Sequence, residues 1–291
     1  MTPALWTIVA LGGWLALWFA NTRLVAAHPG GSGPTARAID LAVPVLFGLA
    51  LLLLWEGLVR GLDVSPVILP APTTIAETFA ASTEVLWRDF VQTWWRAVVR
   101  GWAIGCLAGF LVAVLCDRSA FLRAGLMPVG NLMAALPIIG VAPIMVMWFG
   151  FDWQSKVAVV VLMTFFPMLV NTVAGLAESD QMSRDLLRSY SASYWQTLWS
   201  LRLPAAMPFV FNALKITSTL ALIGAIVAEF FGTPLVGMGL RIKLAMGSLD
   251  LALVWAEIVV AALAGSLGYG AIALVERAVT HWHPSMRGRG R

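Results

Sequence analysis

Charged residues are scarce in this sequence. They make up 12% of its 291 residues, whereas 60% of the residues are hydrophobic and the mean hydropathy is +0.85. Soluble globular domains carry about 25% charged residues, so this composition excludes an ordinary soluble protein. The long apolar runs that take the place of the charges favour a chain embedded in a lipid bilayer.

Cysteine and histidine are also rare, and their placement favours neither a disulfide nor a metal site. Cys106 and Cys116 lie ten positions apart in one apolar run, about 15 Å apart along a helix that rises ~1.5 Å per residue, too far to form a disulfide. His281 and His283 have no acidic or cysteine residue near them, so we interpret them as structural. No Ser/His/Asp set or pair of carboxylates indicates a catalytic site.

A nucleotide-binding loop is missing as well. The phosphate-binding motif G-x-x-x-x-G-K-[ST] needs a lysine after a glycine, and none of the three lysines follows one. The glycines of VGMGLRI, Gly237 and Gly239, do not complete a dinucleotide fingerprint and favour a loop on the outer face. We therefore expect that this chain holds no cofactor and is not itself an enzyme.

Seven apolar runs are long enough to cross a membrane. About 20 residues are needed for each crossing, and the runs lie near residues 4–22, 39–59, 93–116, 125–149, 157–177, 206–230 and 252–275. The short alternating segments of a membrane β-barrel are not found. The first run lacks a basic region before it, which favours a retained helix over a signal peptide. The sequence thus predicts an all-α, polytopic helical bundle.

The basic residues predict the orientation of this bundle, because Lys and Arg in short loops stay preferentially on the cytoplasmic side. With the N-terminus outside and the C-terminus inside, eleven arginines face the cytoplasm and five basic residues face the other side. The eleven are Arg23, Arg37, Arg118, Arg123, Arg184, Arg188, Arg202, Arg277, Arg287, Arg289 and Arg291. Membrane orientation therefore explains the net charge of +4 and the basic tail at 284–291 without a nucleic-acid partner.

Polar residues and prolines inside the apolar runs are candidates for a translocation path or gate. Pro128, Pro137, Pro143 and Pro167 are expected to interrupt helices, which a membrane tolerates only beside protein or a cavity. The candidates are Asn131, Pro137, Trp148, Asn171, Asn212, Thr217 and Glu229. Each polar side chain fits either a path for a polar solute or a hydrogen bond between helices. Glu229 fits an outer gate or a partner for a helix end or an arginine, and Trp148 fits stacking on a planar solute or the interfacial belt.

The longest polar segment, residues 178–202, is expected to be helical and cytoplasmic. Leu187, Tyr190, Tyr194, Leu198 and Leu201 recur at steps of three and four, which predicts one apolar stripe. The stripe could pack on the protein's own helix ends or dock a cytosolic partner, and periodicity alone favours neither.

Two prolines follow this segment in LPAAMP. Pro204 is predicted to end the cytosolic helix and start the next one, because proline lacks an amide hydrogen and disfavours helix in the residue before it. The two elements are therefore expected to meet at a rigid joint.

Four stretches together resemble the permease subunit of an ATP-binding-cassette importer of the nitrate, sulfonate and taurine type. They are LPAPTTI, LMAALPIIGVAPIMVMWFGF, FFPMLVNTVAGL and YSASYWQTLWSLRLPAAMPFVFNALKI, and the resemblance covers about residues 66–283. It implies a type I importer fold, with a transmembrane domain (39–283) that contains a coupling segment (178–203). An extra N-terminal helix with a Gly/Pro-rich connector (1–38) and a basic cytoplasmic tail (284–291) lie outside the resemblance and are predicted from the apolar runs and the composition.

The resemblance also implies partners. A bacterial inner-membrane permease of this kind moves a small organic or anionic solute, delivered by a periplasmic or lipoprotein solute-binding protein, by alternating access. It pairs with a second permease copy or a related permease, and separate ATPase subunits bind ATP and Mg²⁺. From composition alone, an ion-coupled carrier or channel and a membrane scaffold subunit remain the alternatives.

The residues that would couple to the ATPase follow from the motif before LPAAMP. Asp185 stands where Glu is usual, Leu187 where Ala is usual, and Ser191 where Gly is usual, while Ala192, Leu203 and Pro204 match. Arg188, Tyr190 and Tyr194 complete the expected coupling set. A serine adopts the positive φ of a glycine turn at a cost of ~1 kcal/mol, so the turn is expected to differ here. Either a variant family with its own ATPase surface or one half of a heterodimer would explain this departure.

Overall fold

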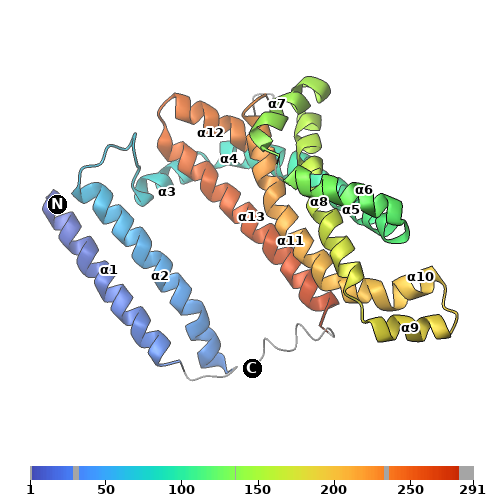
Figure 1. Ribbon diagram of the computed structural model, residues 1–291. Helices are drawn as coiled ribbons and strands as arrows, with labels where there is room; N and C mark the ends of the chain where they lie inside the picture. The colour runs from blue at the N-terminus through green and yellow to red at the C-terminus, as the bar shows by residue number, and fades with distance from the viewer. Residues whose placement is uncertain (1, 29–32, 135, 233–235, 282–291) are drawn as a thin grey trace. The chain divides into compact units, whose positions relative to one another are not determined.

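The computed structural model describes residues 2–28, 33–134, 136–232 and 236–281, and within these ranges every regular element is a helix (Figure 1). The helices are α1 (Pro3–Ala26), α2 (Pro34–Gly61), α3 (Pro72–Ala81), α4 (Thr83–Phe90), the π-helical η1 (Val91–Val99), α5 (Arg100–Arg118), α6 (Ala120–Ala134), α7 (Ile138–Phe149), α8 (Trp153–Ala177), α9 (Gln181–Ser189), α10 (Tyr194–Thr197), the π-helical η2 (Leu198–Arg202), α11 (Leu203–Glu229), α12 (Met238–Gly247) and α13 (Leu251–Val279). The predicted basic tail at 284–291 and His283 lie outside the described residues.

The membrane spans agree with the predicted helical bundle. Six helical stretches are long and apolar enough to cross a bilayer, namely Leu5–Ala26, Pro34–Gly61, Thr83–Arg118, Trp153–Ala177, Tyr194–Glu229 and Leu251–Val279. A seventh crossing is possible through α6 and α7 together, which are bent by 106° at the break between them.

The predicted run at 125–149 is therefore not one straight helix. Pro137 is the N-cap of α7 and lies at the break, where its fixed φ suits a helix start. The prediction that the other prolines interrupt helices was wrong, because Pro128, Pro143 and Pro167 lie inside α6, α7 and α8. In a membrane, neighbouring helices and local hydrogen bonds compensate the bond that a helical proline loses.

The described contacts divide the chain into two compact units. The first comprises residues 1–83 and 244–257, and the second comprises residues 84–243 and 258–290. In the first unit α1 packs along α2, and Gly57 touches Ala10 so closely that a Cβ at position 57 would lie 1.8 Å from the Ala10 Cβ. The predicted boundary at residue 38 thus falls inside α2, whose later turns also contact α1.

The second unit is built around α8, which packs between α5 and α11. Gly101, Gly105 and Gly109 recur every four residues on α5, and each faces α8. A Cβ at Gly105 would lie 2.0 Å from the Thr164 Oγ1, so only glycine permits this approach. Small residues at this spacing are how helices associate closely in lipid, where no hydrophobic force drives them together.

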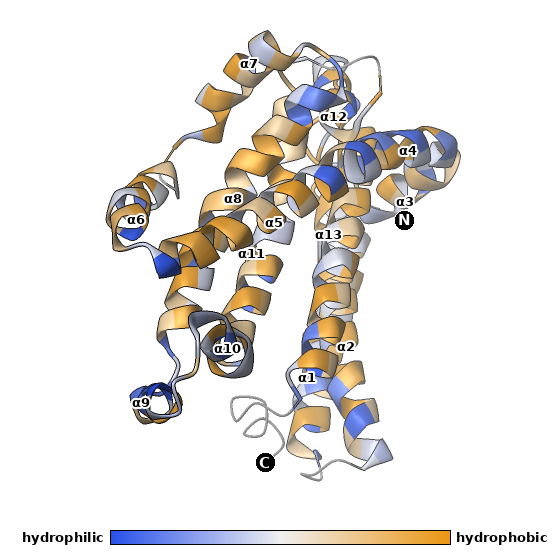
Figure 2. Cartoon of the chain, turned by 90° about the vertical axis from the view of Figure 1, so that its right-hand side faces the viewer, coloured by the Kyte–Doolittle hydropathy of each residue, from blue (hydrophilic) through white to orange (hydrophobic). Residues whose placement is uncertain are grey.

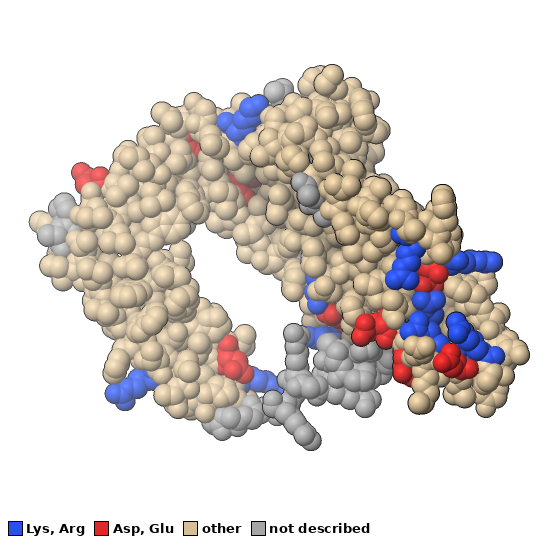
Figure 3. Space-filling model, viewed as in Figure 1, with Lys and Arg blue, Asp and Glu red and all other residues tan. Residues whose placement is uncertain are grey.

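Hydrophilic and charged residues are concentrated at one end of the second unit. Figure 2 shows α9 largely hydrophilic, whereas the adjoining α8 and α11 are largely hydrophobic. In the space-filling view the charged side chains gather over α9 and α10 (Figure 3). This end is where α5 and α8 finish and α11 begins, and we take it as the first candidate site.

Candidate coupling site at the polar end of the bundle

Helix α9 is a short surface helix with no buried residue. Its N-cap, Asp180, accepts hydrogen bonds from the Ser183 backbone N–H and Oγ, both at 2.9 Å. These bonds hold the pKa of Asp180 below its ordinary value, because they favour the charged carboxylate. Asp180 therefore fixes where the helix begins, in a position that the helix dipole also favours.

A tight turn joins α9 to α10 at the position where the resembling motif has glycine. Ser191 has φ +56°, and its N–H donates to Arg188 O at 2.9 Å while the Ala192 N–H donates to Leu187 O at 3.0 Å. Ser193 then caps α10 in a reciprocal capping box with Gln196. The turn keeps the positive φ although serine replaces glycine, so its geometry does not differ in the way that the substitution predicted.

This turn corrects the prediction of a single apolar stripe. Leu187 lies on α9, Tyr190 caps its C-terminus, and Tyr194 and Leu198 follow the turn on α10 and η2. The stripe is therefore split between two helices. Tyr190 is 77% exposed, whereas Leu198 is buried with Leu176 and Ala206, and Tyr194 packs against that cluster. The second half of the stripe therefore packs on the protein's own helices, whereas in the first half Leu187 is half-buried and Tyr190 is exposed.

The predicted helix end at Pro204 was also wrong. Helix runs without a break from Tyr194 through η2 to Glu229, with Pro204 in the first turn of α11. The π-helical turn at Leu198–Arg202 provides the physical reason, because it shifts the backbone hydrogen-bond pattern where the proline lacks a donor. Leu203 and Pro204 are half-buried, and they connect the polar end to the span instead of separating the two.

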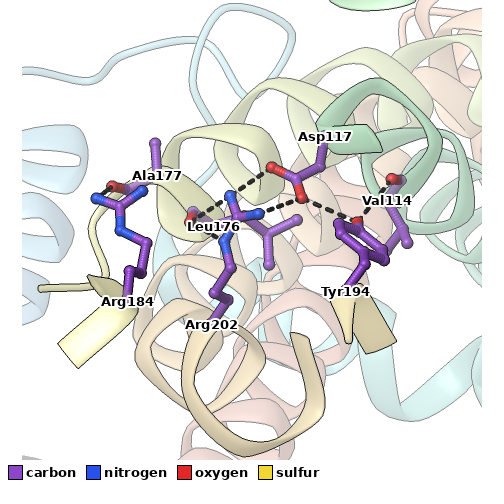
Figure 4. Close-up of polar contacts among 7 residues, drawn as sticks. All are labelled: Val114, Asp117, Leu176, Ala177, Arg184, Tyr194 and Arg202. Carbon is purple, nitrogen blue, oxygen red and sulfur yellow. Dashed lines mark hydrogen bonds and ion pairs between the residues drawn. The ribbon is translucent and has the colours of Figure 1, made fainter. Parts of the chain in front are cut away.

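A largely buried ion pair lies at this joint (Figure 4). The Arg202 Nη1 and Nη2 donate to the Asp117 Oδ2 and Oδ1 at 2.6 and 2.5 Å, and Nη2 and Nε also reach the Leu176 carbonyl oxygen at 3.0 and 3.2 Å. The two side chains are 14% and 4% exposed. The Tyr194 hydroxyl donates to the Asp117 Oδ2 at 2.9 Å. We call Asp117, Leu176, Tyr194 and Arg202 the clamp.

The clamp joins four helical elements at one point. Asp117 comes from the end of α5, the Leu176 carbonyl from the end of α8, Tyr194 from α10 and Arg202 from η2, which leads into α11. A bidentate Arg–carboxylate pair of this kind is geometrically specific as well as strong. Asp117 was missed by the sequence reasoning, because the 85 residues that separate it from Arg202 hide the pairing.

The remaining coupling candidates form the exposed part of the site. Asp185 and Arg188 are exposed and lie 3.5 Å apart as a surface pair, and Ser191 is exposed beside Tyr190. Leu187 and Ala192 are half-buried beneath them. The structure therefore brings the candidate residues together on α9 and the turn, and the clamp holds the following α10 and η2 on the bundle.

Glu229 lies at the opposite end of the unit, in a buried polar cluster. Its carboxylate accepts from the Thr93 Oγ1 at 2.8 Å and from the Gly239 N–H at 2.7 Å. Asp89, also buried, accepts from the Gly237 N–H at 2.6 Å and from Arg241 Nε at 2.7 Å. Glu229 is thus the partner of a helix start, one of its two expected roles, and the cluster fixes the segment that leads into α12.

The other path and gate candidates are scattered. Thr217 is buried and accepts a hydrogen bond from Trp102 Nε1 at 3.0 Å, which links α11 to α5. Asn171 donates to the Pro167 carbonyl oxygen at 2.8 Å within its own helix. Asn131, Asn212 and Trp148 are exposed, the last at 72%. The structure does not bring these residues together into one site.

The sequence of this chain matches the model of a known protein family. The model of the binding-protein-dependent transport system inner membrane component matches residues 105–281. The formylaminopyrimidine transport permease protein ThiX of Halalkalibacterium halodurans is 32% identical over 246 residues, covering 84% of this chain and 98% of that protein. The riboflavin transport system permease protein RibX of Chloroflexus aurantiacus is 31% identical over 84% of this chain and 91% of its own length.

More distant similarities agree. The taurine transport system permease protein TauC of Escherichia coli is 27% identical over 86% of this chain and 92% of its own length. Among solved structures, an inward-facing form of the MetNI methionine ABC transporter superposes with a TM-score of 0.60 at 20% identity, covering 69% of this chain and 98% of that one. This last likeness shows the fold alone.

Proposed function

The chain belongs to the family of binding-protein-dependent transport system inner membrane components, and we propose that α9 and the following turn are the surface through which a separate ATPase drives it. As a member of this family it is a multi-pass membrane permease of an ATP-binding-cassette importer. The observation that carries the proposal is the clamp, which ties α10 and η2, the elements directly after the exposed coupling surface, to the ends of α5, α8 and α11. A movement of α9 would then be transmitted to three spanning helices.

The energy source lies on another polypeptide in this proposal. The sequence holds no phosphate-binding lysine motif, so ATP and Mg²⁺ would bind to partner ATPase subunits. A second permease copy or a related permease would complete the path, and a periplasmic or lipoprotein binding protein would deliver the solute. The substrates named for the relatives, formylaminopyrimidine, riboflavin and taurine, support a small organic solute as the cargo.

The orientation follows from the same assignment. If an ATPase binds α9, this end must face the cytoplasm, which agrees with the distribution of arginines and places the N-terminus outside. A cysteine at Thr2 should then react with an impermeant thiol reagent added outside intact cells, and one at Ser193 should not. Both positions are exposed in the structure. The reverse labelling pattern would overturn both the orientation and the coupling role.

Reconstitution tests the function as a whole. The chain is purified with its partner ATPase and binding protein and placed in liposomes, and uptake of the solute carried by that binding protein is measured. We expect uptake that needs both ATP hydrolysis and the binding protein. Uptake driven by an ion gradient without ATP would instead support an ion-coupled carrier, the alternative that the composition leaves open.

A further inference from the structure

A small apolar cavity lies where α6 and α7 break apart, and neither the coupling site nor the buried polar cluster around Glu229 uses it. Its volume is about 140 Å³. The side chains that line it come from α6, α7, α8, α11 and the link at the break: Met133, Leu136, Ile138, Val141, Val159, Leu162, Met163, Phe166, Pro167 and Leu220. None of these residues carries a charge, so the cavity offers nothing to balance a sulfonate, a carboxylate or a bicarbonate ion.

The volume of the cavity and the polarizable side chains that line it suit the ring of a small organic molecule. A dry engineered cavity of about 150 Å³ holds one benzene molecule, so about 140 Å³ suits a single six-membered ring. Two methionine thioethers and one phenyl group line the cavity, and both groups contact aromatic rings favourably. Gly224 allows this lining, because a Cβ there would lie 2.6 Å from the Met163 Sδ.

We propose that this cavity holds one uncharged aromatic or heteroaromatic ring of the solute during its passage through the membrane. The proposal rests on the proposed import function and narrows its cargo from small organic solutes to ring-bearing ones. The cavity lies between α8 and α11, whose other ends are joined by the clamp. A movement at the coupling surface therefore reaches the two helices that enclose the ring.

Binding of small fluorinated probes to the purified full-length chain in detergent micelles tests this proposal, with ¹⁹F line broadening as the readout. The probes are a fluoropyrimidine with one ring, a fluoroquinoline with two rings, a fluorohexane of similar bulk and the anion trifluoromethanesulfonate. Val141→Phe fills the cavity, and Met163→Ala enlarges it. Ile139→Phe is the matched control, since Ile139 is 66% exposed on the same helix and does not line the cavity.

We expect the fluoropyrimidine to bind the wild-type chain and Ile139→Phe equally, and Val141→Phe at least about tenfold more weakly. Met163→Ala should shift the preference toward the fluoroquinoline, which keeps the test independent of how Val141→Phe folds. Equal pyrimidine binding by all variants, or binding of the fluorohexane or of the anion at the same site, would overturn the proposal. Because no ATPase or binding protein is present, such a result leaves the import function standing.

Discussion

Removing the carboxylate of the clamp is the perturbation with the largest expected effect. In Asp117→Ala the Arg202 guanidinium keeps only the Leu176 carbonyl, and the Tyr194 hydroxyl keeps only a 3.4 Å contact to Val114 O. Breaking a buried ion pair on one side costs about 3–5 kcal/mol. Since the Arg202 side chain is 14% exposed, we expect the lower end, about 3 kcal/mol of unfolding free energy.

Two assays separate stability from coupling. Thermal unfolding of Asp117→Ala, Arg202→Ala and the double variant in detergent forms a mutant cycle, in which the combined loss should fall short of the sum by about 2 kcal/mol. In liposomes containing the full transporter, uptake per ATP hydrolysed should fall for each single variant, because α9 remains docked while its movement no longer reaches the spans.

Tyr194→Phe is the mild control in this series. It keeps the ring in the Leu176 cluster and removes only the hydroxyl that donates to Asp117, so it should lose about 1 kcal/mol. The reasoning is refuted if the cycle is additive within about 0.5 kcal/mol, or if Asp117→Ala folds normally and transports with an unchanged ratio of uptake to ATP hydrolysis.

Three further predictions concern local structure. Ser191→Gly removes the cost of a positive φ and should raise the free energy of unfolding by up to about 1 kcal/mol with coupling retained. A lower unfolding midpoint for this variant would contradict the inference that the Ser191 backbone is strained. Gly105→Ala should destabilise the bundle by about 1–3 kcal/mol because its Cβ meets Thr164, while Gly125→Ala, with open space around it, should not; equal unfolding midpoints would disprove the close α5–α8 contact. Because the folded pKa of Asp180 is lowered, its contribution to α9 is present above its unfolded pKa, about 3.9, and is lost as the pH falls through the folded value. Amide hydrogen exchange of residues 182–189, corrected for the intrinsic rate, should therefore show less protection at pH 3 than at pH 6, and Asp180→Ala should abolish the difference; an equal difference in that variant would exclude Asp180 as the cause.

The spanning helices could be predicted from the sequence because lipid imposes one simple requirement, a run of about 20 apolar residues. The confirmed family also followed from local stretches of sequence. Contacts between distant residues could not be predicted in this way. Asp117 reads as an ordinary charge at the end of an apolar run, and only the folded chain shows that it is buried against Arg202, 85 residues later.

Proline was the main source of error for a related reason. In water a proline inside a helix predicts a break, but Pro128, Pro143 and Pro167 lie within helices and Pro204 lies in a continuous one. Neighbouring helices in a membrane and a π-helical turn can accommodate the missing hydrogen bond, and neither is visible in the sequence. Glu229 had two open interpretations because its partners, Thr93 and the Gly239 amide, come from other segments.

Site-directed crosslinking to the ATPase tests the central claim most directly. A cysteine at Tyr190, which is 77% exposed beside the turn after α9, is compared with one at Trp148, which is 72% exposed on α7. In the assembled, active transporter, a short bifunctional thiol reagent should link position 190 to a cysteine in the ATPase cleft and leave position 148 unlinked. Efficient crosslinking from position 148, with none from position 190 in a complex that still imports its solute, would contradict the assignment of α9 and its turn as the coupling surface.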